Sequence, residues 1–389
     1  MKFLLNISTT IPMIIFGILA TYCSNEQLQK NEDLDLPLPS TFYKGADLSY
    51  VNEMEDCGAI FLDNDGNTQS PFTTIANAGG NLVRVRLWND PTDFTNYSTI
   101  DDVESTIRRA KDNNLQVLLD FHYSDRWTDP GTQVTPKAWA SVQNNSTKLG
   151  DSLFKYTYQV LKRLNTKNLL PNIVQVGNEI NTEILQAKDG QGLIINWERN
   201  SALINRGISA VRKASKDFNT PIEIMLHVAQ PENALFWFKA ASDNGIIDYD
   251  WIGVSYYPAN STFKLNNTEA YENLGNAIRL LREAHEKQVM IVETAYAFTL
   301  ENFDEASNIL STDSLIDSYS ATQQGQLNFL NRLVEVVEDA GGAGVVYWEP
   351  AWVATNCTTL FGTGSNWDNA TLYDDSGKPT LGMNFFNIK

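Results

Sequence analysis

Two glutamates in this 389-residue sequence stand where a purely structural role is hard to assign. Glu179 lies in the run "IVQVGNEI" (173–180) and Glu293 in "VMIVETAY" (289–296); both runs are typical of buried strands. A buried strand gains nothing from a carboxylate at its end, because burying a charge costs free energy unless the charge is paired. Two facing carboxyl groups suit glycoside hydrolysis, in which one is the acid and the other the nucleophile or base. The alternative is a structural network of salt bridges.

Other runs of this kind also carry polar or aromatic residues near their ends. The strand-like runs cover 45–51, 82–88, 116–123, 173–179, 223–228, 251–257, 289–296 and 344–350. Besides the two glutamates, the residues near their ends are Asp47, Arg84, Arg86, His122, Asn178, His227, Tyr256 and Trp348. One such residue is more often a satisfied structural group, but their recurrence on nearly every strand indicates a shared polar cleft.

Longer amphipathic stretches separate these runs. Apolar residues at three- and four-residue spacing predict helices within 100–114, 149–165, 200–216, 270–287 and 322–341. Strand–helix alternation repeated eight times implies parallel strands with right-handed crossovers, and eight such units can close into a barrel. The expected fold is therefore α/β, a single-domain (β/α)8 TIM barrel. A doubly wound open sheet is the alternative, but it would favour a Gly-rich phosphate turn after an early strand, which the sequence lacks.

Such a barrel would bring the two glutamates to one cleft. The carboxyl ends of barrel strands converge on one face, and strands four and seven lie across its mouth from each other. Arg84, if it reaches Glu293, would keep that carboxylate ionised, and the Tyr256 hydroxyl could donate to it. Glu179 would then keep its proton, which separates the two carboxyl groups into acid and nucleophile. Asn178 is expected to meet a sugar hydroxyl.

The composition limits the classes of ligand. The net charge of −18 argues against nucleic acid as a partner, because nucleic-acid binding needs clustered Lys and Arg. It also disfavours a polyanionic substrate. The chain has nine Trp, a residue type that flat ligands exploit, although core packing is the commoner role for any one of them.

The N-terminus reads as a targeting segment. Lys2 is followed by a mostly apolar stretch, 3–20, that resembles a secretory signal more than a membrane span. Cys23 follows, as in a bacterial lipoprotein signal. We therefore predict a signal peptide at 1–22, a lipid anchor at Cys23, a flexible linker at 23–41 and a catalytic domain at 42–389. This organisation predicts a cell-surface protein, an outer-membrane lipoprotein of a bacterium; plain secretion is the alternative.

Seven blocks carry a family resemblance from Gly45 to the end of the chain. They are "GADLS", "VRVRLWNDP", "DFHYSDRWTDPGTQ", "VQVGNEI", "GVSYYP", "VETAY" and "VYWEPAW". Together they resemble the arabinogalactan endo-β-1,4-galactanases of glycoside hydrolase family 53, within the retaining "4/7" superfamily of (β/α)8 glycoside hydrolases. The block "DFHYSDRWTDPGTQ" is long and specific; Thr128 within it replaces the Ala that is common in the family.

The resemblance implies a function and a set of site residues. Glu179 would be the general acid/base and Glu293 the nucleophile, about 5–5.5 Å apart, in a double displacement. The expected substrate is the β-1,4-galactan of pectin side chains, cut internally by a monomer that needs no organic cofactor. The cleaved subsite would be lined by Arg84, His122, Asn178, His227, Tyr256 and Trp348, with Asp47, Asp125 and Trp352 as further sugar contacts. Candidate stacking platforms are Trp88, Trp127, Trp139 and Trp367, with core packing as the alternative for each.

The sequence leaves two alternative functions open. Another "4/7" glycosidase acting on mannan, xylan or glucan would share the barrel and the carboxylates. A non-catalytic glycan-binding protein on the same scaffold should lack one of the two carboxylates, yet both are present.

Metal binding and disulfide formation depend on the loops of the barrel. Some family members carry calcium after strand seven, but residues 297–314 lack the corresponding ligand run, so a structural calcium is not supported. The stretch "DNDGN" (63–67) resembles the start of a calcium loop without its closing Glu, and a polar turn is the expected structure. Cys57 and Cys357 follow strands one and eight, which are neighbours in a closed barrel, so the two cysteines could pair.

Overall fold

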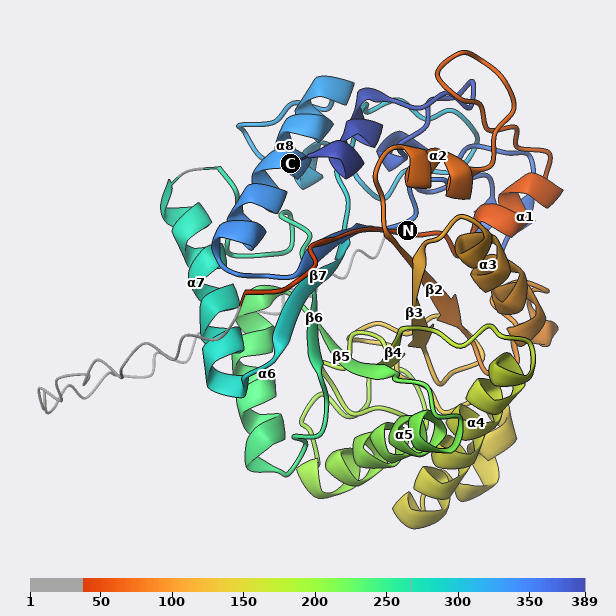
Figure 1. Ribbon diagram of the computed structural model, residues 1–389, viewed down its shortest axis with the longest axis vertical. Helices are drawn as coiled ribbons and strands as arrows, with labels where there is room; N and C mark the ends of the chain where they lie inside the picture. Colours follow the sequence, from red (N-terminus) through yellow and green to blue (C-terminus); the bar gives the residue numbers. More distant parts are fainter. Residues whose placement is uncertain (1–37, 267, 389) are drawn as a thin grey trace, which may run out of the picture. The chain divides into compact units, whose positions relative to one another are not determined.

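The structure, a computed structural model, describes residues 38–266 and 268–388 (Figure 1). The predicted signal peptide (1–22), Cys23 and most of the predicted linker (23–41) lie outside these residues. The described residues all belong to one compact unit. Within them, no helix has both the length and the apolar character needed to cross a membrane.

Eight parallel strands close into a barrel, which confirms the predicted fold. The strands are β1 (Tyr43–Asp47), β2 (Leu82–Leu87), β3 (Gln116–Phe121), β4 (Ile173–Val176), β5 (Glu223–Ala229), β6 (Trp251–Ser255), β7 (Gln288–Thr294) and β8 (Gly344–Tyr347). Each strand pairs with its neighbour in the sequence, and β8 pairs with β1 to close the ring. The first predicted strand, 45–51, was placed too late, because the chain turns at Leu48 and Val51 already begins a helix.

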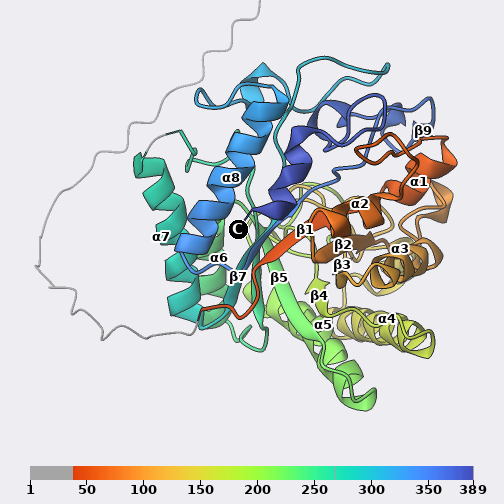
Figure 2. The same cartoon turned by 45° about the horizontal axis from the view of Figure 1, so that its top comes forward.

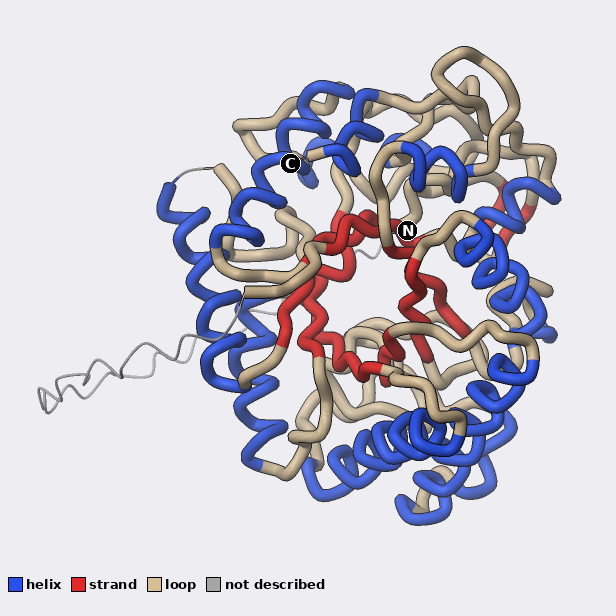
Figure 3. The backbone as a smooth tube through the Cα atoms, in the orientation of Figure 1, coloured by secondary structure: helices blue, strands red, loops and turns tan. Residues whose placement is uncertain are grey.

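The helices form a layer around the strands (Figures 1, 2 and 3). They are α1 (Val51–Asp56), α2 (Pro71–Asn77), α3 (Ile100–Asp112), α4 (Ser146–Thr166), α5 (Trp197–Asp217), α6 (Pro231–Asp243), α7 (Thr268–His285) and α8 (Gln323–Asp339). The five predicted helices correspond to α3, α4, α5, α7 and α8. The sequence pattern missed α1 and α2, which are only two turns or less, and α6, in which aromatic residues occur on both buried and exposed positions.

The long helices have local start signals as well as buried faces. Asn145 and Asn196 precede α4 and α5, and each accepts a hydrogen bond from a backbone N–H of the first helical turn. This capping satisfies donors that would otherwise lack an intrahelical partner. The two helices pack against each other along apolar faces that include Leu153 and Leu203. They thereby hold β4 and the loop after it in place.

Two layers of side chains fill the barrel interior. An apolar layer near the amino ends of the strands includes Leu82, Leu118, Ile173 and Met225. Residues two apart on a strand share a face, so each of these strands next presents a polar residue one step closer to its carboxyl end. Those next residues are Arg84, Asp120, Gln175 and His227, all at most 1 % exposed. The apolar layer thus closes the barrel beneath a buried polar layer that supports the catalytic face.

Candidate active site

Glu179 follows β4 at the carboxyl end of the barrel. Gly177 has φ 88° and Glu179 itself has φ 45°, so the chain turns sharply here. A side chain at Gly177 would come within 2.6 Å of the Ile180 side chain, which explains the glycine. A non-glycine residue in the left-handed region is held there at a cost by its surroundings. The turn places the Glu179 side chain, half-buried, on the catalytic face.

Glu293 ends on the same face, inside β7. Its Oε1 lies 2.8 Å from Nη1 of Arg84, and its Oε2 accepts a hydrogen bond of 3.3 Å from the hydroxyl of Tyr257. The residue is only 5 % exposed. A buried carboxylate with a guanidinium and a phenol as partners is held in one orientation and stabilised in its ionised form.

Glu179 has a different set of partners. Its Oε1 accepts a hydrogen bond of 2.6 Å from the hydroxyl of Ser255, the last residue of β6. Nε2 of His227 lies 2.7 Å from the same hydroxyl oxygen. Burial lowers the pKa of His227 well below its ordinary value, and the Arg84 charge acts in the same direction, so the imidazole is neutral. Glu179 therefore meets neutral donors, whereas Glu293 meets a cation.

The two carboxyl groups influence each other's ionisation. Burial raises the pKa of Glu179 to about 7, against a smaller opposing effect of the Ser255 hydrogen bond. Burial also raises the pKa of Glu293, to about 8; Arg84 opposes this, while the charge of Glu179 adds to it. Near neutral pH the pair therefore holds one proton between its members. That proton belongs on Glu179, because the ion pair with Arg84 and the Tyr257 hydroxyl favour the ionised form of Glu293.

Arg84 is the centre of the buried polar layer. Besides Glu293, its guanidinium contacts Asp47 at 2.8 Å, Asp120 at 2.8 Å and the Asn178 side-chain oxygen at 2.8 Å. Gln175 completes the network, donating to Asp120 over 2.7 Å and accepting from Arg84 Nε over 3.2 Å. A buried guanidinium needs such partners on every side. Asp120 and Gln175 were not predicted as site residues, although each is a polar residue inside an apolar strand.

The Asn178 amide is largely engaged by the protein. Its Nδ2 donates to the Thr128 carbonyl at 2.8 Å, and only 1 % of the residue is exposed. His227 is fully buried beneath Glu179, so it supports the acid through Ser255 instead of lining the cleft. Both residues lie beside the catalytic pair, but the prediction that His227 lines the cleaved subsite is wrong, because its ring is fully buried.

His122 lies beside the same network. Its Nε2 is 3.0 Å from Asp120, and its Nδ1 accepts from the indole N–H of Trp88 at 3.3 Å and the backbone N–H of Thr128 at 3.2 Å. Two donors on Nδ1 leave the ring proton on Nε2, directed at Asp120. Burial lowers the pKa of His122, which keeps the ring neutral. Trp88, only 2 % exposed, therefore orients His122 and offers no open face for stacking.

The structure corrects the prediction for Tyr256. Its hydroxyl donates to the Phe263 carbonyl at 2.6 Å, and the side chain is fully buried away from Glu293. The adjacent Tyr257 makes the contact that was expected of Tyr256. The pairing of β6 with β7 shifts register between Val254 and Ser255, so the strict alternation of side chains does not continue past the end of the strand.

Tryptophans form one wall of the site. The ring centroid of Trp348 lies 4.6 Å from that of Trp367, 5.7 Å from that of Trp127 and 6.0 Å from that of Trp352. Trp127 is half-buried, while the other three are at most 6 % exposed. Trp139 lies elsewhere: it packs in the core against Tyr156, so of the two roles expected for it core packing is the one that the structure supports.

Asp125 and Arg86 support the loops around the site. The Asp125 carboxylate accepts from the backbone N–H groups of Asp90 and Lys137, so it ties two loops together. Arg86 forms a buried ion pair of 2.9 Å with Glu349 and lies over the Trp127 ring at 5.2 Å. Glu349 follows Trp348 directly and escaped prediction, although a glutamate at the end of β8 resembles the pattern of Glu179 and Glu293.

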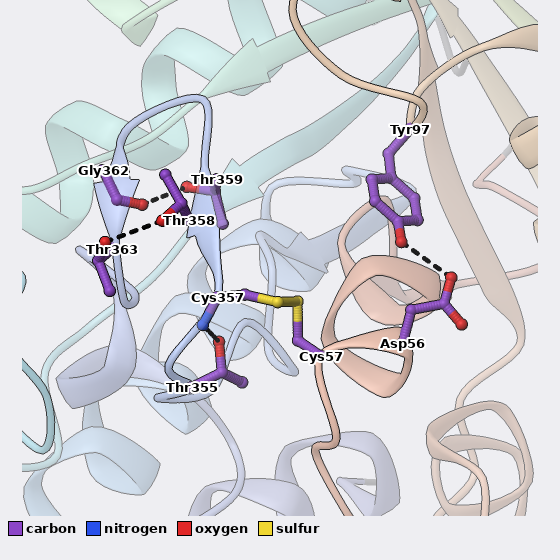
Figure 4. Close-up of a disulfide and its surroundings, with 9 residues drawn as sticks. All are labelled: Asp56, Cys57, Tyr97, Thr355, Cys357, Thr358, Thr359, Gly362 and Thr363. Carbon is purple, nitrogen blue, oxygen red and sulfur yellow. Dashed lines mark hydrogen bonds between the residues drawn. A yellow bond between two sulfur atoms is a disulfide. The ribbon is translucent and has the colours of Figure 1, made fainter.

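A disulfide bond joins Cys57, directly after α1, to Cys357, with Cα atoms 5.6 Å apart (Figure 4). Cys357 precedes a small antiparallel hairpin of β9 (Thr358–Thr359) and β10 (Gly362–Thr363). Phe361, at the turn of this hairpin, has its ring centroid 6.0 Å from that of Trp127. The disulfide thus links the loop after β1 to the loop after β8 beside the tryptophan wall.

Carboxylates of the two acidic loops, 63–67 and 297–314, bind backbone N–H groups of the protein itself. Asp304, in the loop after β7, accepts from the backbone N–H of Ser365 at 2.7 Å and of Ala306 at 2.8 Å. Asp63 accepts from the backbone N–H groups of Asp65 and Asn67, as a polar turn does. Among residues 38–266 and 268–388, no group of three or more His, Cys, Asp or Glu side chains could hold a metal ion. Asp304 and Asp63 thus bind backbone N–H groups, which does not fit a calcium site of the kind that some members of the resembling family carry.

Known proteins of one family are similar to this chain over most of its length. Residues 43–386 match the family model of glycosyl hydrolase family 53. An arabinogalactan endo-β-1,4-galactanase of Cellvibrio japonicus is 52 % identical over 339 residues, which cover 87 % of this chain and 88 % of that protein. An endo-β-1,4-galactanase of Bacillus subtilis is 35 % identical over 361 residues, covering 87 % of this chain and 79 % of that protein.

Solved structures agree with the sequence comparison. The catalytic domain of a family 53 protein from Ignisphaera aggregans superimposes with a TM-score of 0.79 at 28 % identity, over 91 % of this chain and 98 % of that chain. A fungal β-1,4-galactanase gives a TM-score of 0.74 at 27 % identity, over 90 % of this chain and 99 % of that chain. The chain belongs to glycosyl hydrolase family 53.

Proposed function

We propose that this protein is a retaining endo-β-1,4-galactanase with Glu293 as nucleophile and Glu179 as general acid/base. The observation that carries the assignment is the contrast between the two carboxyl groups. Glu293 is paired with Arg84 at 2.8 Å, whereas Glu179 accepts from the neutral Ser255 hydroxyl. Retaining hydrolysis needs one ionised and one protonated carboxyl group at the start of the reaction.

Each step then has a defined proton balance. Glu293 attacks the anomeric carbon and forms a glycosyl ester as the bond to the leaving oxygen breaks, and Glu179 gives its proton to that oxygen. In the second step Glu179 takes a proton from water, the water oxygen attacks the anomeric carbon, and Glu293 leaves as a carboxylate. Arg84 stabilises Glu293 whenever it is ionised, and Ser255 stabilises Glu179 between the two steps.

The substrate class rests on the relatives and on charge. The relatives from Cellvibrio japonicus and Bacillus subtilis are named as endo-β-1,4-galactanases. A net charge of −18 suits neutral galactan better than the anionic backbone of pectin. The alternatives mannan, xylan and glucan are outcomes of the following test.

The test compares the release of reducing ends from potato galactan, mannan, xylan and glucan. We expect galactan to be cleaved fastest, with a mixture of oligosaccharides early in the digest and the β-anomer as the first product by NMR. Glu293→Gln should abolish cleavage while preserving the fold. Inversion of the anomeric configuration would contradict the mechanism, and faster cleavage of another glycan would contradict the substrate.

We further propose that Cys23 carries a lipid anchor after removal of residues 1–22 and places a monomeric enzyme at the cell surface. The support is the apolar segment with Cys23 directly after it. Expression with labelled palmitate in a bacterial host should label the wild type but not Cys23→Ser. Release of unlabelled wild-type protein into the medium would favour plain secretion. Light scattering of the protein without residues 1–23 tests the monomer.

A further inference from the structure

An uncharged aromatic groove lies next to the catalytic acid and has no role in the chemistry described above. It has a volume of about 620 Å³ and includes Trp197, Phe236, Leu193, Asn181 and Thr182 in its lining. This volume is within the range of about 300–1,000 Å³ that small-molecule sites occupy. Phe236 is 79 % exposed and Leu193 is 67 % exposed, so apolar surface is gathered here in contact with water.

One wall of the groove contacts the backbone of the catalytic acid. The backbone N–H of Asn181, on its wall, donates to the carbonyl of Glu179 itself over 2.8 Å. The Asn181 side chain is fixed by two hydrogen bonds to the backbone of Ala229, at the end of β5. Thr182, the next wall residue, donates to the Pro130 carbonyl from the loop after β3. The wall nearest to Glu179 is therefore rigid and belongs to the catalytic face.

The helices that complete the groove begin on that same face. Trp197 is the first residue of α5, which follows β4, and Phe236 lies in the second turn of α6, which follows β5. In a parallel barrel the helices start on the side where the strands end. Trp237, which also lines the groove, packs beside Trp197, with ring centroids 5.7 Å apart.

The position of the groove identifies the part of the substrate that it would take. Glu293 is on β7, whereas the groove is lined by the loops after β3 and β4, on the Glu179 side of the barrel, and by residues of α5 and α6. The general acid protonates the oxygen between the cleaved sugar and the leaving group. The leaving group therefore binds on the side of the acid that faces away from the nucleophile.

The chemistry of the lining favours a neutral sugar chain. The groove has no charged side chain in its lining, although the chain as a whole carries a net charge of −18. Aromatic and aliphatic side chains beside amide and hydroxyl groups suit a ligand with apolar C–H faces and many hydroxyls. A polyanion would find no cation in this lining to pair with.

We propose that this groove binds the galactosyl units on the leaving-group side of the scissile bond, with the exposed ring of Phe236 as a stacking platform. The inference rests on the proposed galactanase function and adds to it the site that holds the leaving chain. A sugar-binding role explains why apolar side chains are exposed to water in this groove. It also means that the choice of the bond to be cleaved in an oligosaccharide depends on Phe236.

The test uses Phe236→Ala and two substrates. One is a β-1,4-galactohexaose labelled with ¹⁸O at its reducing end, whose leaving portion can reach the groove; the other is an aryl β-1,4-galactobioside, whose short leaving group cannot. We expect the ratio of kcat/KM for the hexaose to that for the aryl substrate to fall about three- to tenfold. The label should also show a shift of the cleaved bond toward the reducing end, because fewer units are held beyond the acid.

Leu280→Ala, at an exposed apolar position of α7, is the matched control and should leave both the ratio and the cleaved bond unchanged. An unchanged ratio in Phe236→Ala, or an equal loss on both substrates, would overturn the inference. A wild-type protein that cleaves neither substrate would instead refute the proposed function. If Phe236→Ala changes the oligomeric state but not the ratio, the groove is a protein interface and the inference also fails.

Discussion

Ser255 connects the catalytic acid to a buried histidine and thereby adjusts the proton affinity of Glu179. Its hydroxyl donates to Glu179 over 2.6 Å, and this hydrogen bond lowers the pKa of a carboxyl group that burial has raised. Ser255→Ala should therefore raise the pKa of Glu179 further. The basic limb of the kcat/KM profile should move to higher pH, and kcat should fall about tenfold, the value of one lost hydrogen bond to a charged group.

The matched control for this change is Ser261→Ala, another buried serine, whose hydroxyl donates to Glu232 over 3.0 Å. It should leave the pH profile in place. A basic limb that moves to lower pH in Ser255→Ala, or one that does not move, would show that Ser255 does not control Glu179.

Adjacent tyrosines provide a second prediction at the scale of the residue. Tyr257→Phe removes the phenol that donates to Glu293, so the pKa of this carboxyl should rise. The acidic limb of the profile should move to higher pH and kcat/KM should fall roughly tenfold. Tyr256→Phe removes the hydrogen bond to Phe263; it should keep the pH profile and cost about 1 kcal/mol of unfolding free energy. The opposite pattern in the two variants would restore the assignment made from sequence.

At the scale of the element, the alternation of strand side chains explains what could be predicted. The positions of Glu179 and Glu293 follow from strands that end on one face, and the barrel follows from eight strand–helix repeats. The same period of two also predicts a polar layer at Asp120 and Gln175. Each stands two residues after an apolar residue of the barrel interior, Leu118 or Ile173, so the strands "QVLLDF" and "IVQV" carry the signal for this layer.

Other parts of the site depend on geometry that no period describes. Tyr257 replaces Tyr256 because the register shifts at the end of β6. Trp139 looked like a candidate platform, but it lies on a short 3-10 helix (Lys137–Val142) that turns its ring into the core. The groove around Phe236 combines the loops after two strands, β3 and β4, with two helices, so its residues share no local sequence signal.

The disulfide bond gives a prediction about the elements that it joins. It connects the end of α1 to the hairpin beside Trp127, across 300 residues of sequence. Cys57→Ser with Cys357→Ser should lower the unfolding free energy by about 2–4 kcal/mol, because the unfolded chain loses a constraint. Calorimetry should show a reduced Tm for the double variant, and dithiothreitol should lower the Tm of the wild type only. An equal response of both proteins to the reductant would show that the bond does not contribute.

At the scale of the whole molecule, the active site lowers stability at alkaline pH. The pKa of Glu179 is raised from 4.5 to about 7 by burial, so the folded protein binds this proton more tightly than the unfolded chain. The resulting stabilisation is complete below pH 4.5 and is lost as the pH rises through 7. This pH dependence of stability is opposite to that of a carboxylate in a favourable surface ion pair, whose stabilisation is lost as the pH falls.

Glu179→Gln tests this linkage, because glutamine has a similar shape, can still accept from Ser255 and does not ionise. At pH 8 the variant should be more stable than the wild type by about 3 kcal/mol, with a higher Tm in calorimetry. At pH 4 the two proteins should unfold together, since Glu179 is then protonated and uncharged. Glu283→Gln, at an exposed position of α7, should show no such crossover. A wild type that is the more stable protein at pH 8 would mean that Glu179 is held ionised in the fold, and the roles of the two glutamates would have to be exchanged.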